Sequence, residues 1–138
     1  MTYRTFNETI LLRLDPGEEI LASLKRLCEQ ENIVLGAVQG IGAARFAVLG
    51  LFPPATKQYT TNRFEEIEIV SLTGNITAMD GEPYLHLHMA VADAQGRTFG
   101  GHLTECVISA TAEIVVKRID GAVGRKFSEE IGLNQMDL

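Results

Sequence analysis

The sequence has no tryptophan, only two cysteines, and no surplus of positive charge. Twelve Lys and Arg residues stand against 18 Asp and Glu residues, so the formal net charge is −6 at pH 7. Proteins that bind nucleic acid through phosphate contacts normally present a basic face. The densest basic cluster, formed by Lys117, Arg118, Arg125 and Lys126, is flanked by acidic residues. We therefore expect the isolated chain not to bind nucleic acid with useful affinity.

Cys28 and Cys106 are too few for the disulfide framework of a small secreted protein. The first residues include an acidic side chain and form no apolar leader, so we expect a cytoplasmic protein with reduced, buried thiols. The most apolar stretch, residues 33–54, is interrupted by Gln39, Arg45 and several glycines. This stretch fails as a transmembrane helix, and we expect no membrane association.

A chain of 138 residues with 46% hydrophobic residues is long enough to bury the core of one domain, spanning residues 1–138. Residues 3–13 alternate as a strand does, and Asp15 is a candidate N-cap for a helix that Asn32 can end. The apolar residues of that helix recur at helical spacing and should pack on a sheet: Ile20, Leu21, Leu24, Leu27 and Cys28.

Strand-like segments with turn residues between them follow the helix, at 33–39, 44–52, 56–61, 65–78, 83–92, 97–104 and 108–118. The pattern predicts an α+β fold in which one long helix packs on a mostly antiparallel sheet. The tail, Lys126–Leu138, is the only other candidate for a helix, with Ile131, Leu133 and Met136 spaced to dock on the rest of the protein.

All three histidines of the chain fall within 17 residues, at His86, His88 and His102. Asp93 and Gly96 are typical of the first and fourth positions of a type I turn with a glycine bulge, which makes a three-residue hairpin loop. In that register His88 lies directly opposite His102, and His86 lies two residues along on the same face. A two-residue loop would place His102 opposite a leucine, on the wrong face.

Three converging imidazoles are typical of a metal site that keeps an open coordination position. Zinc is the expected ion, and nickel, cobalt or iron would accept the same ligands. The alternative is that these histidines are ordinary surface or core residues. The residues that share their face on the first strand are small, so we expect a lined cavity or a subunit interface there.

Other motifs carry less chemistry. Gly40-x-Gly42 lacks the third glycine and the following helix of a dinucleotide fingerprint, so a tight turn with close backbone packing is the expectation. Glu66 and Glu68 could supply a general base or a hydrogen-bond partner for an imidazole, or could be solvated edge carboxylates. Strand parity places Glu105 on the face opposite His102, unless Gly100-Gly101 inserts a bulge. No catalytic residue is identified.

Five segments together resemble the plants-and-prokaryotes-conserved (PPC) domain family. They are LRLDPGE at 12–18, VQGIGA at 38–43, EIVSLTGN at 68–75, LHLH at 85–88 and GGHL at 100–103. The resemblance spans about residues 4–138. It implies an α+β fold with one helix against an antiparallel sheet, a homotrimer, and metal on His86, His88 and His102.

Plant relatives in that family join the domain to AT-hook segments, and the family is often labelled DNA-binding for that reason. This chain has no Arg-Gly-Arg-Pro hook. The resemblance therefore leaves several functions open: a metal-dependent enzyme or binder of a small molecule, a DNA-associated regulatory domain, and a metal that only stabilises the assembly.

Overall fold

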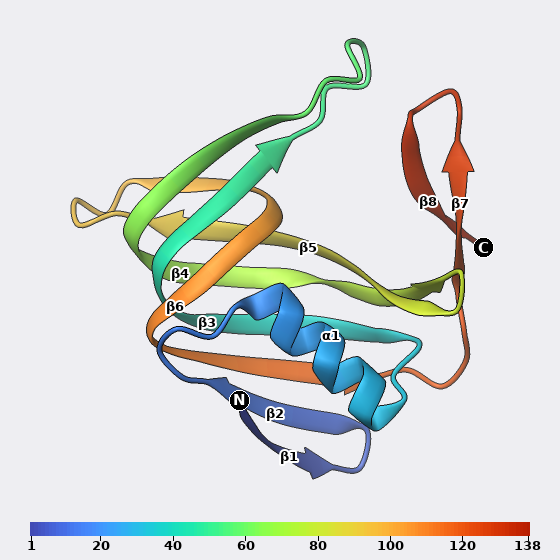
Figure 1. Cartoon of the computed structure of the whole chain (residues 1–138), viewed down its shortest axis with the longest axis horizontal. Coiled ribbons are helices and arrows are strands. Elements are labelled where there is room, and N and C mark those ends of the chain that lie inside the picture. The colour runs from blue at the N-terminus through green and yellow to red at the C-terminus, as the bar shows by residue number, and fades with distance from the viewer.

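The protein is described by a computed structural model that covers residues 1–138, shown in Figure 1. Eight strands and one helix follow one another along the chain: β1 (Thr2–Phe6), β2 (Thr9–Leu14), α1 (Ile20–Glu31), β3 (Gly36–Leu51), β4 (Thr60–Met79), β5 (Glu82–Ala92), β6 (Thr98–Arg118), β7 (Gly124–Ser128) and β8 (Leu133–Asp137).

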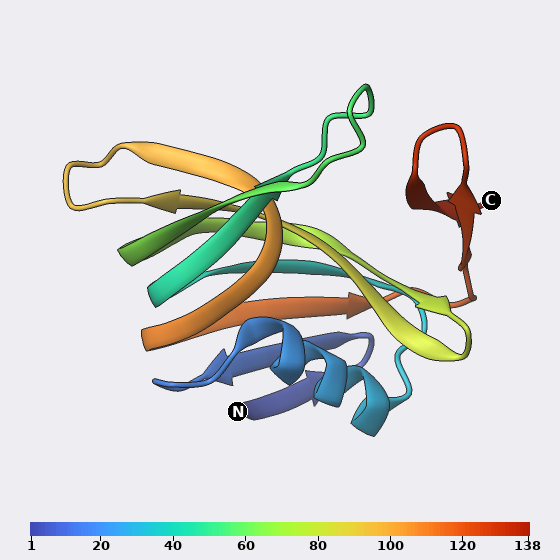
Figure 2. The ribbon, with the colours of Figure 1, turned by 45° about the horizontal axis from the view of Figure 1, so that its top comes forward.

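Six strands form one sheet in the order β1-β2-β6-β3-β4-β5, and every pairing in it is antiparallel. The first part of the long strand β6 also pairs with β5, so the sheet curls and closes on itself at one end. Figure 2 shows β6 bending from its pairing with β5 to its pairing with β3. The predicted α+β class with a mostly antiparallel sheet is confirmed.

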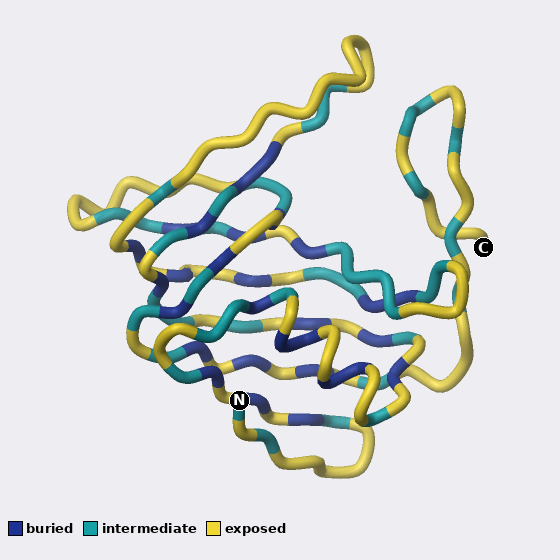
Figure 3. The backbone as a smooth tube through the Cα atoms, in the orientation of Figure 1, coloured by how far each residue is buried: buried dark blue, intermediate teal, exposed yellow.

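The helix α1 covers one face of this sheet, and buried residues line the strands beneath it (Figure 3). Leu24 and Leu27 of α1 are fully buried in the same cluster as Ile114 and Val116 of β6. Both cysteines are buried there as free thiols. The residues between the buried ones on each strand face the other way, and we call that side of the sheet the outer face.

The helix is shorter than predicted, with 12 residues, and begins later. Asp15 accepts a hydrogen bond from the backbone N–H of Glu18 in a turn that contains Gly17 at a φ of 87°. The N-cap is Glu19, whose carboxylate accepts from the N–H of Ala22. Asn32 ends the helix in the left-handed conformation, as expected.

Four predicted segment boundaries are wrong. Residues 3–13 form two strands, because Asn7 adopts a φ of 51° and turns the chain. The segments 33–39 and 44–52 are one strand, β3, with an irregularity between Gly40 and Gly42. Strands β4 and β6 likewise join segments that were expected to be separate. Bulges kink these strands without ending them, and a sequence pattern shows such a kink as a break.

The C-terminal tail is a β-hairpin, which corrects the expectation of a second helix. Strands β7 and β8 pair through Gly132, which has a φ of 84°. Leu133 and Met136 are partly exposed and do not form a docking stripe. No helix in the fold has both the length and the apolar character needed to cross a membrane.

We predict that Gly74→Ala destabilises the protein by about 1–3 kcal/mol, the usual range for overpacking. A Cβ atom at Gly74 would lie 2.0 Å from the backbone oxygen of His86, so β4 and β5 would have to separate. Urea denaturation measures the change. Gly124→Ala is the control, because a Cβ there meets nothing within 4 Å. Equal stability of the two variants would contradict the prediction.

Candidate metal centre

The three histidines lie on two neighbouring strands of the outer face. His86 and His88 belong to β5 and His102 to β6, and the pairing places His88 directly opposite His102. The predicted register is confirmed. As expected, Leu87, Met89 and Val91 alternate with these positions and are buried in the core.

The loop between β5 and β6 sets this register. The N–H of Gly96 donates to the carbonyl of Asp93, and Gly96 has a φ of 74°, as a type I turn with a glycine bulge requires. The Asp93 carboxylate accepts from the backbone N–H groups of Gln95 and Arg97 and from the Arg97 guanidinium. These bonds lower the pKa of Asp93 against an opposing effect of desolvation.

The imidazole rings form a nearly equilateral triangle. Their centroids are 5.3 Å apart for His86 and His88, 5.3 Å for His86 and His102, and 5.4 Å for His88 and His102. One ligand nitrogen from each ring lies within 4.8 Å of the other two. Tetrahedral zinc needs nitrogens about 3.4 Å apart at bonds of about 2.0–2.1 Å, which small side-chain rotations would supply. The donor set therefore fits a divalent metal.

Glycines let other groups approach His102 closely. A Cβ at Gly50, the β3 residue opposite His102, would lie 2.1 Å from the Cε1 atom of Tyr59. A Cβ at Gly101 would lie 2.7 Å from the Gly50 carbonyl oxygen. The Tyr59 ring therefore lies against the backbone of β3, with its centroid 5.9 Å from that of His102 and 5.8 Å from that of Phe52.

Arg125 of the C-terminal hairpin reaches the other side of the triangle. Its guanidinium donates to Thr77 Oγ1 and to Asn75 Oδ1, and it lies over the Tyr84 ring at 4.5 Å from the centroid. Asn75 is paired directly opposite His86. Sequence reasoning placed Arg125 in a basic surface cluster and missed this position, because the contact joins segments about 50 residues apart.

The surroundings of His86 and His102 favour the neutral imidazole, the form that binds metals. Burial, helped by the nearby His86 and His88, lowers the pKa of His102 to about 4. Burial also lowers the pKa of His86, and the Arg125 charge adds to this effect, followed by His88. Burial raises the pKa of Tyr59, so its phenol keeps its proton at neutral pH. No proton needs to leave these two imidazoles at pH 7 before a metal can bind.

Of the acidic residues considered as partners of the histidines, only Glu105 lies on the face of His102 and near it along β6. Glu68 pairs with Ala92, four residues along β5 from His88, a separation of about 13 Å at about 3.3 Å per residue. Glu68 therefore does not contact an imidazole, and Glu66 is exposed at a kink with a φ of 49°. The expected position of Glu105 is wrong. Val48 of β3 pairs with Glu105, whereas its neighbour Leu49 pairs with Leu103, so β6 has one extra residue, a bulge, at this point. The bulge places Glu105 on the same face of the sheet as His102.

The Gly40-x-Gly42 segment is part of β3 and precedes no helix, so it offers no phosphate site. A Cβ at Gly42 would lie 2.4 Å from the Thr111 carbonyl oxygen, which confirms the expected close backbone packing. The expected tight turn is instead an irregularity inside a continuous strand.

Comparison with known sequences supports the resemblance drawn from the motifs. A sequence model described as the Plants and Prokaryotes Conserved (PCC) domain matches residues 1–120. The bifunctional protein GlmU of Synechococcus sp. (strain JA-3-3Ab) is 43% identical over 107 residues, which make up 76% of this chain. The matched part is only 16% of that relative, so the chain resembles a small portion of it.

Two solved structures are similar over almost the whole chain. One is described as a candidate DNA-binding protein from Bacteroides thetaiotaomicron, with a TM-score of 0.95, 32% identity, and coverage of 99% of this chain and 96% of that one. The other is described as a metal-containing protein from Archaeoglobus fulgidus, with a TM-score of 0.86, 30% identity, and coverage of 99% and 98%.

We predict that the metal-free protein loses stability as the pH falls from about 6.5 to about 4. The folded state keeps His102 unprotonated down to about pH 4, whereas the unfolded chain protonates it near pH 6.5. The unfolded state therefore binds more protons in this window, and acidification favours it. Chemical denaturation of the chelator-treated protein at several pH values measures the slope. His102→Gln should flatten it, and identical slopes would contradict the assignment.

Proposed function

We propose that this chain, which belongs to the Plants and Prokaryotes Conserved (PCC) domain family, binds one divalent metal ion through His86, His88 and His102. The observation that carries the proposal is the convergence of three ligand nitrogens within 4.8 Å. The low pKa values of His86 and His102 support it, because both rings are neutral at pH 7. The description of a relative at 30% identity as metal-containing agrees with it.

Zinc is the ion that this donor set favours, and nickel, cobalt or iron are the alternatives. With three imidazole ligands, the ion would keep a position open for water or for an oxygen of a small molecule. A bound metal of this kind polarises a carbonyl group or lowers the pKa of a bound water. We therefore propose that the protein binds a small molecule at the metal. If the protein is an enzyme, this small molecule is its substrate.

The surrounding residues have roles that do not depend on the metal. The Tyr59 ring lies beside His102, and the Tyr84 ring, near His86, supports the Arg125 guanidinium. Glu105 is a carboxylate on the same face of β6 as His102 and can accept a proton from a ligand. Such an arrangement would orient a small ligand and exclude part of its hydration.

We predict that the purified protein holds close to one metal ion per chain and that a His88→Ala, His102→Ala variant holds almost none. Elemental analysis after dialysis against buffer without chelator measures the content. Glu68→Gln is the control, because it removes a carboxylate from the outer face at a distance from the imidazoles. Full metal content in the double variant would refute the assignment.

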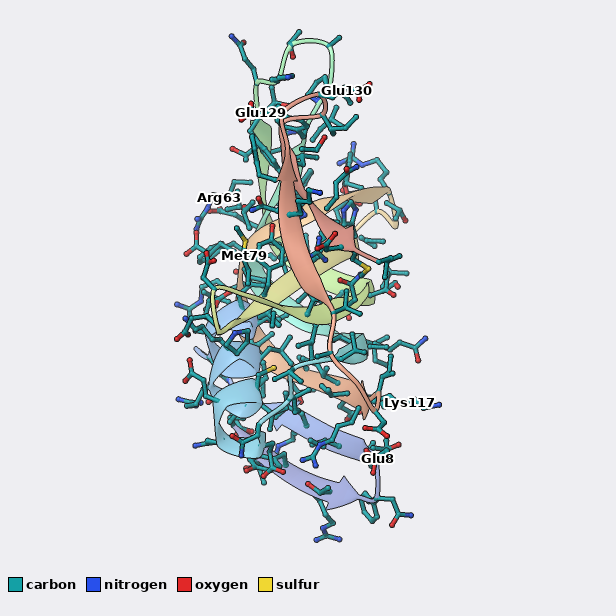
Figure 4. The ribbon with its side chains drawn as sticks, turned by 90° about the vertical axis from the view of Figure 1, so that its right-hand side faces the viewer. Glu8, Arg63, Met79, Lys117, Glu129 and Glu130 are labelled. Carbon is teal, nitrogen blue, oxygen red and sulfur yellow. The ribbon has the colours of Figure 1, made fainter.

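DNA binding is the alternative function, and we propose that the isolated chain lacks it. The basic residues are dispersed: Arg118 pairs with Glu31, and Arg125 is engaged at Asn75 and Thr77. Figure 4 shows Lys117 near Glu8 at the end opposite to Glu129 and Glu130. Counterion release requires a basic surface that faces the duplex, and this chain carries a net charge of −6.

We predict no saturable binding of a labelled AT-rich duplex at ~150 mM salt in fluorescence anisotropy. Weak association at very low salt is compatible with the acidic chain, because screening no longer limits a local patch. A dissociation constant below about 1 µM at ~150 mM salt would be tighter than ordinary non-specific binding, and it would favour the regulatory function.

We also propose that the protein assembles as a homotrimer. The outer face carries an apolar patch in which Leu11 is 48% exposed, Ile41 58%, Val70 50% and Val115 37%. A groove of about 820 Å³ runs over this patch. Exposed apolar patches on sheets mark interaction surfaces, and the family resemblance supplies the number three.

Light scattering should give three times the chain mass of 15.1 kDa. Val70→Glu should shift the protein toward the monomer, because it places a charge in the patch. Ile119→Glu is the control, since Ile119 is exposed but lies outside this patch. A monomeric wild type, or a trimer that survives Val70→Glu unchanged, would contradict this proposal.

A further inference from the structure

Arg125 is held by hydrogen bonds to three neutral groups. Its Nε donates to Thr77 Oγ1 at 2.9 Å, its Nη2 to Asn75 Oδ1 at 2.8 Å, and its Nη1 to the carbonyl of Asn134 at 3.0 Å. A guanidinium group has five N–H donors, so one remains on each terminal nitrogen. These two remaining N–H groups are available to donate to the oxygens of a carboxylate.

The guanidinium lies on the same face as the histidine triangle. Asn75 and Thr77 of β4 are the residues directly opposite His86 and Tyr84 of β5. The guanidinium also lies over the ring of Tyr84, and Tyr84 is two residues before His86 on β5. Its three hydrogen bonds and its stacking contact therefore hold it beside His86.

The positive charge of Arg125 has no counterpart in the protein. None of the ion pairs in the chain includes it. Arg63 makes the opposite case: it stacks on Phe46 at 3.5 Å and pairs with Glu65 at 3.0 Å. A half-buried cation without a partner is costly, and a divalent metal beside it would add repulsion. An anion bound between them would offset both effects.

We propose that Arg125 recognises the carboxylate of a small anionic ligand whose second oxygen occupies the open position at the three-histidine centre. This inference rests on the proposed metal binding. The ligand class is a short carboxylic acid with a neighbouring hydroxyl or carbonyl oxygen, because Asn75 and His86 are cross-strand neighbours. The contacts of Arg125 fix the guanidinium in place, so that little rotamer freedom is lost on binding.

The test uses the full chain loaded with cobalt, whose visible spectrum reports its coordination. Lactate is the probe, and lactamide is its neutral counterpart. Lactate should bind the wild type at least tenfold more tightly than lactamide does. Arg125→Gln should remove most of that preference and leave lactamide binding unchanged. Arg125→Lys should retain part of the preference, because it keeps the charge but loses the planar guanidinium.

A second readout separates recognition from a merely structural role. Without any carboxylate present, Arg125→Gln should bind cobalt as tightly as the wild type or more tightly, because a repelling charge has gone. A variant that only loosened the β7–β8 hairpin would bind cobalt more weakly. Arg63→Gln is the matched control, since it removes another stacked arginine, one that has its own carboxylate, and it should change neither affinity.

The outcomes can be told apart. Equal lactate affinity in Arg125→Gln and in the wild type, both with full cobalt content, overturns the role of Arg125 and leaves the metal centre standing. No change in the cobalt spectrum with lactate overturns the ligand class as well. Failure of the wild type to bind cobalt removes the proposed function, and this inference falls with it.

Discussion

The centre depends on one constraint, the pairing register between β5 and β6. Side chains on a strand alternate between faces, so a slip of one residue would send His102 to the face opposite that of His88. The Asp93 carboxylate prevents that slip by accepting from two backbone N–H groups of the loop, and Gly96 supplies the left-handed residue that the loop needs. The same register buries Leu87, Met89 and Val91, so the hydrophobic core and the histidine triangle depend on one alignment.

Around that register, the sheet brings distant segments together by close backbone approach. Strand β6 bends from β5 to β3, and Gly101 lies where a Cβ would collide with Gly50. Gly50 in turn admits Tyr59 to the edge of His102. On the other side, Arg125 brings charge from the last hairpin to His86. The histidines are therefore flanked by an aromatic group on one side and a cation on the other, and the proposed small anionic ligand rests on this combination.

Features of the fold and the site are predictable from the sequence where the residues that determine them are close together in the chain. The β5–β6 hairpin was predictable, because its turn residues and its alternation are local in sequence. The extents of β3, β4 and β6 were not, since bulges such as the one before Glu105 shift the parity without any turn residue to mark them. The role of Arg125 was also hidden, because its partners Asn75 and Thr77 are about 50 residues away. The tail is a hairpin rather than the expected helix, because Gly132 supplies the left-handed residue of its turn and the sparse apolar residues gave no sign of this pairing.

X-ray absorption spectroscopy of the metal in the purified protein tests the central claim most directly, because it counts the ligands and identifies their type. Three imidazoles at about 2.0–2.1 Å, with one or two further oxygen atoms, are the first shell expected from His86, His88 and His102. The multiple-scattering pattern of imidazole should be strong in that spectrum. A shell that contains sulfur at about 2.3 Å, or oxygen ligands without imidazole scattering, would contradict the account.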